Sequence, residues 1–231
     1  MAASSTAGSY VFGLFLTVFG VLLALSQGKE FEYQYVTCGS VLKLLNIRNN
    51  VRLHSHDVKY GSGSGQQSVT GVGSTDDHNS YWTVKGKMGS PCVRGTPIKC
   101  GHVIRLTHLS SKKNLHSHHF SSPLSGNQEV SAFGDKGGGD EGDHWSVECE
   151  ETYWDRGEHF QLKHVVTGQY LHVSGDTYGR PIHGQKEISA HSYANHDGSV
   201  WKVMEGIYVK PNEDSMLNGA TGGSSVHRDE L

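Results

Sequence analysis

The residues Leu53–His56 (LHSH) return as Leu115–His118 (LHSH) and, in changed form, as Leu171–Ser174 (LHVS). The three leucines are 62 and 56 residues apart. Each copy is followed by a Trp-x-Val triplet: Trp82–Val84, Trp145–Val147 and Trp201–Val203. One unit is therefore repeated three times in tandem. Because a unit of this size cannot close a core alone, we expect the copies to pack on one another.

Each copy begins with two apolar residues separated by a polar one, the pattern of a half-buried strand. These first strands are Leu42–Leu44, Ile104–Leu106 and Phe160–Leu162. Turn-forming residues precede the repeated leucine, so a hairpin is expected there. A third strand is expected at Gln67–Val69, Gln128–Val130 and Glu187–Ser189, and the Trp-x-Val triplet forms the fourth.

Four strands in each of three copies predict an all-β chain of twelve short strands, and no segment keeps a helical period. A β-trefoil closes twelve strands in three equivalent copies, with six strands in a barrel and three hairpins across its end. A tryptophan that recurs in every copy fits shared core packing better than a single ligand site. The predicted core residues are Trp82, Trp145, Trp201, Leu53, Leu115 and Leu171.

Both ends of the chain resemble targeting signals. Residues 11–25 are uncharged and mostly apolar, and small residues follow, which predicts a signal peptide over 1–28. No Lys or Arg precedes this segment, so an uncleaved membrane anchor is the alternative. The chain ends Arg228-Asp229-Glu230-Leu231, a close variant of the signal that returns proteins to the endoplasmic reticulum. We therefore expect residence in the lumen, with 36–211 as the folded domain and 212–231 as a flexible tail.

The charge of the chain argues against one class of partner. The net charge is -3, and the 20 Lys and Arg residues never form a basic run, so nothing suggests a nucleic-acid partner.

Four cysteines in an oxidising compartment predict two disulfides. Cys38 and Cys100 precede the first strands of copies one and two, whereas Cys92 and Cys149 follow the fourth strands. Symmetry between the copies favours Cys38 with Cys92 and Cys100 with Cys149. The alternative joins Cys92 to Cys100 and Cys38 to Cys149. A redox role is disfavoured because no two cysteines have the spacing of an oxidoreductase dithiol.

Histidine is abundant, and strand alternation places His54 with His56, and His116 with His118, on one face. Two such imidazoles can ligate zinc, but the spacing supplies no third or fourth ligand, so no metal is predicted. Hydrogen-bonding structural histidines are favoured instead. A further interpretation is that these residues, with Gln67 and Gln128, line a surface groove for a sugar, a peptide or a protein partner.

Two glycine-rich segments are interpreted as loops. Gly61–Gly65 superficially resembles a nucleophile elbow, but turn formers flank it where a strand and a helix are required. Gly134–His144 carries Asp135, Asp140, Glu141 and Asp143, which could hold calcium, yet the calcium-loop spacing is absent. The sequence therefore predicts no catalytic residue, no cofactor and no enzyme activity.

With its LHSH motifs, the chain resembles the MIR module of protein mannosyltransferases and of inositol trisphosphate and ryanodine receptors, here in three repeats. Gly39–Asn46 and Val51–Thr70 resemble, more narrowly, the stromal cell-derived factor 2 family, and the likeness extends from Val36 to Pro211. The resemblance implies a soluble lumenal β-trefoil that acts beside the chaperone BiP and a J-domain co-chaperone and limits aggregation of secretory clients. The third copy departs from the His-Ser-His pattern, so a surface built on that motif is not expected to be threefold.

Two hypotheses of function follow. The first is a non-enzymatic lumenal quality-control factor that binds the J-domain co-chaperone, BiP and unfolded clients. The second is a carbohydrate-binding module for O-mannosyl chains, which the kinship to mannosyltransferases suggests.

Overall fold

The computed structural model describes residues 33–136, 138–194 and 197–212. The chain divides into two units, Met1–Gln34 and Tyr35–Leu231, and every described strand belongs to the second. The predicted signal peptide at 1–28 and the retrieval signal at Arg228–Leu231 lie outside the described residues.

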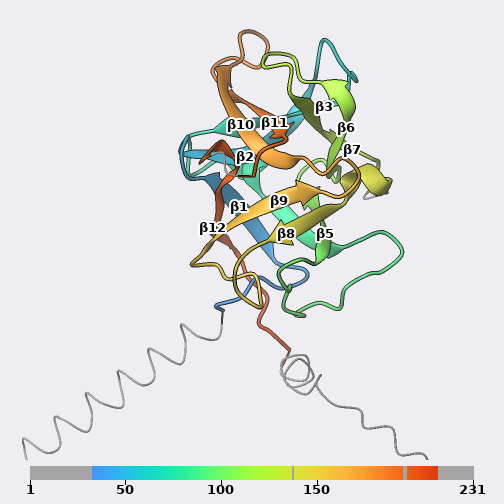
Figure 1. The fold of residues 1–231 in the computed structure, drawn as a ribbon, viewed down its shortest axis with the longest axis vertical. Helices are drawn as coiled ribbons and strands as arrows, with labels where there is room; N and C mark the ends of the chain where they lie inside the picture. The colour runs from blue at the N-terminus through green and yellow to red at the C-terminus, as the bar shows by residue number, and fades with distance from the viewer. Residues whose placement is uncertain (1–32, 137, 195–196, 213–231) are drawn as a thin grey trace, which may run out of the picture. The chain divides into compact units, whose positions relative to one another are not determined.

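In the described part of the folded unit, the regular structure consists of β-strands and three short 3-10 turns, one before each Trp-x-Val strand (Figure 1). The turns are η1 (His78–Ser80), η2 (Glu141–Asp143) and η3 (Asp197–Ser199). The strands of copy one are β1 (Val41–Asn46), β2 (Val51–Lys59), β3 (Gln67–Val72) and β4 (Trp82–Gly86). Those of copy two are β5 (Val103–His108), β6 (Asn114–Ser121), β7 (Gln128–Phe133) and β8 (Trp145–Glu148). Those of copy three are β9 (His159–His164), β10 (Tyr170–Thr177), β11 (Lys186–His191) and β12 (Trp201–Ile207).

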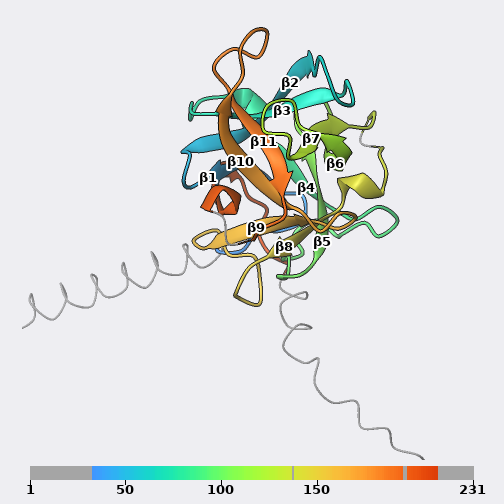
Figure 2. The ribbon, with the colours of Figure 1, turned by 45° about the horizontal axis from the view of Figure 1, so that its top comes forward.

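Six of these strands close into a barrel. β1 pairs with β4, β4 with β5, β5 with β8, β8 with β9, β9 with β12, and β12 returns to β1. The other six form the hairpins β2–β3, β6–β7 and β10–β11. The hairpins pair with one another in a triangle through β3, β7 and β11 (Figure 2). The predicted twelve-stranded β-trefoil is confirmed.

The repeated leucine and the repeated tryptophan meet in every copy. Trp82, Trp145 and Trp201 are fully buried, at 0% exposure, and their indole Nε1 atoms each donate to the carbonyl of the leucine in the same copy. The distances are 2.8 Å to Leu53, 3.0 Å to Leu115 and 2.9 Å to Leu171. A buried indole needs a hydrogen-bond partner, and this one ties the fourth strand to the second. All six residues lie in the main hydrophobic core.

The third strand of copy three was predicted to begin at Glu187, in line with Gln67 and Gln128, and this alignment is wrong by one residue. Lys186 pairs with Thr177 as Gln67 pairs with Lys59 and Gln128 with Ser121. Lys186, and not Glu187, is thus the equivalent of the two glutamines. Glu187 instead takes the place of Ser68 and Glu129. A one-residue shift places a side chain on the opposite face of a strand, so the distinction matters.

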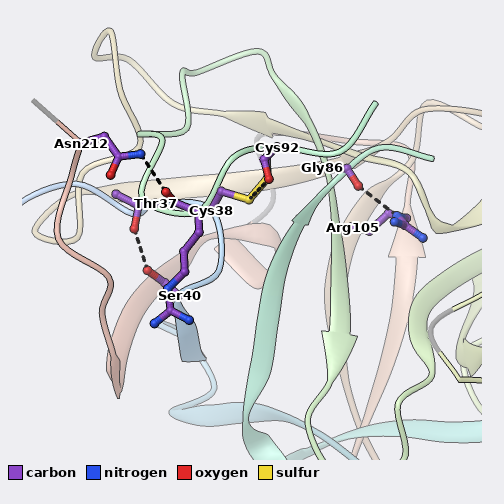
Figure 3. The surroundings of a disulfide bond; sticks show 8 residues. Thr37, Cys38, Ser40, Gly86, Cys92, Arg105 and Asn212 are labelled. Atoms are coloured by element: carbon purple, nitrogen blue, oxygen red, sulfur yellow. Dashed lines mark hydrogen bonds between the residues drawn. A yellow bond between two sulfur atoms is a disulfide. The ribbon is translucent and has the colours of Figure 1, made fainter. Parts of the chain in front are cut away.

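Two disulfides connect the start and the end of the first two copies. Cys38 is joined to Cys92, with Cα atoms 6.0 Å apart, and Cys100 to Cys149, with Cα atoms 5.3 Å apart. Figure 3 shows the first bridge beside Thr37 and Ser40, whose side-chain oxygens are 2.9 Å apart. This is the pairing that repeat symmetry favours. Copy three contains no cysteine.

Candidate functional site

The first histidine of each motif is buried and fixes the turn before the tryptophan strand. His54 and His116 are each 5% exposed. Nδ1 of His54 lies 2.7 Å from Asp77 Oδ2, and Nδ1 of His116 lies 2.9 Å from Asp143 Oδ1. In copy three, His172 Nδ1 lies 3.2 Å from Ser199 Oγ. In all three copies, these histidines hold the 3-10 turn against the second strand.

The second histidine of each motif reaches closer to the surface. His56 Nδ1 is 2.9 Å from His54 Nε2, and burial, followed by the neighbouring His54, lowers the pKa of His56. His118 Nε2 is 3.0 Å from Glu129 Oε1. The rings of each pair lie about 5 Å apart, as strand alternation predicts. Each pair bonds within its own copy or to a neighbouring strand, and no hydrogen bond between described residues joins one pair to the other.

The two predicted glutamines bridge adjacent copies. Gln67 Nε2 donates to Ser55 Oγ at 2.8 Å and to Ser111 Oγ, in copy two, at 2.9 Å. Gln128 Nε2 donates to Ser117 Oγ at 2.7 Å and to Thr167 Oγ1, in copy three, at 2.8 Å. These amides therefore hold the turn of the next copy. The Nε2 donors of both glutamines, like the imidazoles of His54 and His116, thus form polar contacts within the fold.

A second set of polar core residues has no counterpart among the sequence predictions. Asn46, His108 and His164 occupy the same position in the three copies, two residues after the first-strand leucine, and are buried. Asn46 Nδ2 donates to the carbonyl of Gly198 at 2.8 Å. The Nε2 atoms of His108 and His164 lie 2.9 Å from the carbonyls of Asn79 and Gly142. Each side chain thus binds the turn of the preceding copy. In the sequence, the signal for this set is a polar residue two positions after the first-strand leucine in every copy.

Burial makes these two histidines sensitive to acid. Their rings lie about 5 Å from those of Trp82 and Trp145. Desolvation by burial lowers the pKa of His108 and of His164 from 6.5 to about 4. The neutral imidazole is therefore the form that the fold accommodates.

We expect the free energy of unfolding to decrease as pH falls from about 6.5 to about 4. In that window the unfolded chain binds protons on these histidines and the folded chain does not, so stability rises with pH. Each histidine contributes a slope of up to about 1.4 kcal/mol per pH unit. Urea unfolding at pH 4.5, 5.5 and 7.0 measures it. The double variant His108→Asn, His164→Asn, which carries the residue of copy one, should have a shallower slope. An unchanged slope would contradict the assignment.

Buried carboxylates lock the hairpins together. Glu129 is fully buried and accepts hydrogen bonds from the backbone N of Ser64, at 3.2 Å, and from its hydroxyl. Glu187 is equally buried and accepts from the backbone N atoms of Leu124 and Ser125 at 2.8 and 3.1 Å. Each therefore holds the hairpin loop of the preceding copy. In copy one the position is Ser68, whose buried hydroxyl has no hydrogen-bond partner in the described structure.

We expect Ser68→Ala to leave stability unchanged or to raise it by about 1 kcal/mol, because it removes a buried polar atom that lacks a partner. Ser55→Ala is the matched control. The Ser55 hydroxyl donates to the Ser68 carbonyl at 2.8 Å and accepts from Gln67, so its loss should cost about 1–2 kcal/mol. Urea denaturation of both variants makes the comparison. Equal destabilisation by the two changes would show that the Ser68 hydroxyl is satisfied.

A polar hollow of about 340 Å³ lies between copies two and three. Phe120, Asn127, Gln169 and His191 are among the residues that line it. Phe120 is 51% exposed, and Gln169 lies beside it in the lining of the same hollow. An exposed aromatic ring beside amide groups can bind a ligand that has both an apolar face and hydroxyl groups.

A second, larger hollow of about 600 Å³ lies beside the Cys100–Cys149 bridge. Its lining includes the acidic side chains of Glu148, Glu150 and Asp197.

Among the described residues, no helix has both the length and the apolar character needed to cross a membrane.

Three comparisons place this fold among known proteins. The MIR domain family model matches residues 43–152. Mouse stromal cell-derived factor 2 is 62% identical over 178 residues, which cover 77% of this chain and 84% of that protein. The crystal structure of the SDF2-like protein from Arabidopsis thaliana is 43% identical, covers 78% of this chain and 99% of the other, and has a TM-score of 0.75. A protein O-mannosyltransferase complex of S. cerevisiae, bound to the sugar donor, is 25% identical and covers 81% of this chain and 30% of that one, with a TM-score of 0.66.

The matched MIR region spans copies one and two, which carry the His-Ser-His motif, and ends before the first strand of copy three. The likeness to mouse stromal cell-derived factor 2 extends over more than three quarters of the chain. The chain therefore belongs to the stromal cell-derived factor 2 family of MIR-domain proteins.

Proposed function

We propose that this protein is a non-enzymatic factor of the endoplasmic reticulum lumen that binds a J-domain co-chaperone and BiP and limits the aggregation of secretory proteins. Family membership, at 62% identity to mouse stromal cell-derived factor 2, is the observation that carries the proposal. The predicted signal peptide and the terminal Arg228–Leu231 support the location.

The distribution of polar groups supports a role in binding. His54, His116, Gln67 and Gln128 bond within the fold, so partners are contacted through other, exposed side chains. Large apolar side chains are exposed on the described surface, among them Val93, Tyr193 and Ile207, each at least 70% exposed. Such side chains on a rigid, disulfide-linked body suit contact with other proteins.

Co-purification tests the partnership. The full chain, isolated from the lumen under mild conditions, should retain a J-domain protein and BiP. A chain without Arg228–Leu231, collected from the secreted fraction, is the control for location, because its trefoil is unchanged. Recovery of neither partner with the retained chain would contradict the proposal.

An aggregation assay tests the activity apart from location. The purified chain, with the J-domain protein present, should reduce the light scattering of a diluted, denatured secretory protein. The same chain, reduced and then denatured in urea, is the control for nonspecific protein. Equal protection by the unfolded control would contradict a role for the folded trefoil.

Carbohydrate binding is a second candidate function, favoured by the polar hollow between copies two and three. The exposed Phe120 ring could stack on a sugar face, and the Gln169 amide could bind hydroxyl groups. Calorimetric titration with mannosides tests it, with Phe120→Ala expected to abolish binding and Val93→Ala to leave it intact. All four tryptophans are buried, so tryptophan fluorescence is a poor reporter here. Absence of heat with the unaltered chain excludes this function for the mannosides tested.

A further inference from the structure

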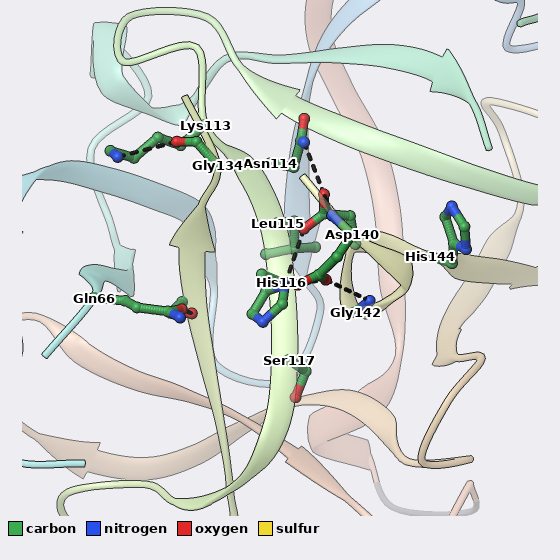
Figure 4. Close-up of polar contacts among 12 residues, drawn as sticks. Gln66, Lys113, Asn114, Leu115, His116, Ser117, Gly134, Asp140, Gly142 and His144 are labelled. Atoms are coloured by element: carbon green, nitrogen blue, oxygen red, sulfur yellow. Dashed lines mark hydrogen bonds and ion pairs between the residues drawn. The ribbon is translucent and has the colours of Figure 1, made fainter. Parts of the chain in front are cut away.

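Copy two brings a histidine and two carboxylates together. His116 lies on β6, and Asp140 and Asp143 lie at the start and end of η2. Figure 4 shows His116 beside Asp140. The potential ligand atoms of all three residues lie within 4.8 Å of one another. His116 Nδ1 is 2.9 Å from Asp143 Oδ1 and 3.5 Å from Asp140 Oδ1. Residues 24 to 27 positions apart in the chain thus converge at one point.

The other two copies show what packing alone requires. In copy one, Asp77 stands at the N-cap position of the turn, and the turn ends at Ser80. One carboxylate, shared by His54 and the Ser80 hydroxyl, holds that histidine and that turn. In copy three the turn ends at Ser199, whose hydroxyl faces His172. Only copy two places a second carboxylate, Asp143, where both other copies have serine. The other two copies hold the same turn without that charge.

The carboxylates are oriented toward His116 by their surroundings. Asp143 is fully buried, and its Oδ2 accepts from Asn114 Nδ2 at 2.9 Å and from the backbone N of Asp140 at 3.2 Å. Its Oδ1 is thereby left facing the imidazole. Asp140 accepts from the backbone N of Gly142 at 2.8 Å. Supporting hydrogen bonds of this kind orient the ligands of metal sites.

The cluster is also open to solvent on one side. The Asp140 side chain is 57% exposed, whereas the other two side chains are buried. An ion could enter past Asp140 and keep water on its exposed side. Three protein ligands with water in the remaining position is a common zinc arrangement.

We propose that His116, Asp140 and Asp143 bind one divalent transition-metal ion of the zinc type through Nδ1 and two carboxylate oxygens. The ion lies between Nδ1 and the two carboxylates, and the imidazole binds it in its neutral form, with its single ring proton on Nε2. The nitrogen ligand selects for zinc-like ions, because calcium and magnesium prefer sites made only of oxygen.

Calorimetric titration of the tag-free, oxidised chain with zinc chloride tests the site. One zinc per chain should bind, and calcium chloride at the same concentrations should not. Asp143→Ser introduces the residue of copies one and three and should abolish binding. Asp140→Asn keeps a side-chain oxygen that can cap the turn and should weaken binding at least about tenfold, the loss typical of disturbed metal sites. Asp77→Asn, at the N-cap position of copy one, is the matched control and should bind zinc as the unaltered chain does.

A cobalt spectrum distinguishes this site from scattered surface histidines. Cobalt bound by the unaltered chain should show d–d absorption that Asp140→Asn changes and Asp77→Asn does not. Circular dichroism without metal checks that each variant is folded. No stoichiometric binding by the unaltered chain, or equal affinity in folded Asp140→Asn, would overturn the proposal. Calcium binding equal to that of zinc would overturn the choice of ion.

Discussion

Replacing Trp145 with alanine should lower the free energy of unfolding by about 3–5 kcal/mol. The indole is fully buried between the barrel and the hairpin of its copy, and its removal leaves a large cavity. The carbonyl of Leu115 also loses the donor that lies 3.0 Å away. Both effects act in the folded state and have the same sign.

Urea denaturation of the alanine variant measures the loss, and Trp145→Phe separates its two causes. Phenylalanine retains most of the apolar contact but cannot donate to Leu115, so we expect an intermediate loss. Trp201→Ala, at the equivalent position of copy three, should behave like Trp145→Ala. A loss of less than 1 kcal/mol in both alanine variants would contradict the core assignment.

Removal of either disulfide should cost about 2–4 kcal/mol, because each bridge closes a long loop in the unfolded chain. The sequence separations are 54 residues for Cys38–Cys92 and 49 for Cys100–Cys149. The paired variants Cys38→Ser, Cys92→Ser and Cys100→Ser, Cys149→Ser each leave one bridge in place. Their unfolding midpoints in urea, relative to the unaltered chain, measure the two contributions.

A reducing agent supplies the control for these variants. It should destabilise the unaltered chain by about as much as both substitutions together and leave a chain without cysteines unaffected. Hydrogen exchange adds spatial detail, because protection should fall most near the missing bridge and least in copy three, which has no cysteine. Uniform loss of protection across all three copies would contradict a local constraint.

The repeat made the architecture predictable from the sequence. Leu53, Leu115 and Leu171 recur with their tryptophans, and any residue that recurs in this way must occupy equivalent surroundings. Repeat symmetry also favoured the disulfide pairing, because one bridge within copy one and one within copy two occupy equivalent positions. It failed at Lys186, because the third strand begins 14, 13 and 15 residues after the repeated leucine in copies one, two and three. Loop lengths that differ between copies leave the strand alignment ambiguous by a residue.

Side-chain networks were harder to predict, because their members come from different copies or from separate elements of one copy. Asn46, His108 and His164 share a position but not a residue type, so they do not stand out as a motif. His116 and the acidic loop were each recognised, but nothing in their spacing indicates that η2 folds back onto β6. Glu129 and Glu187 resemble ordinary strand charges until the hairpin of the preceding copy is placed over them.

The circular order of the barrel determines how other polypeptides can approach it. Each of its six strands has a hydrogen-bonded partner on both sides, because β12 pairs with β1. None of these strands therefore presents a free row of backbone N–H and C=O groups to an extended polypeptide, so the barrel is protected from edge-to-edge aggregation. A protein of this shape would meet unfolded chains through side chains and loops, and would not itself become part of the β-structure into which they aggregate.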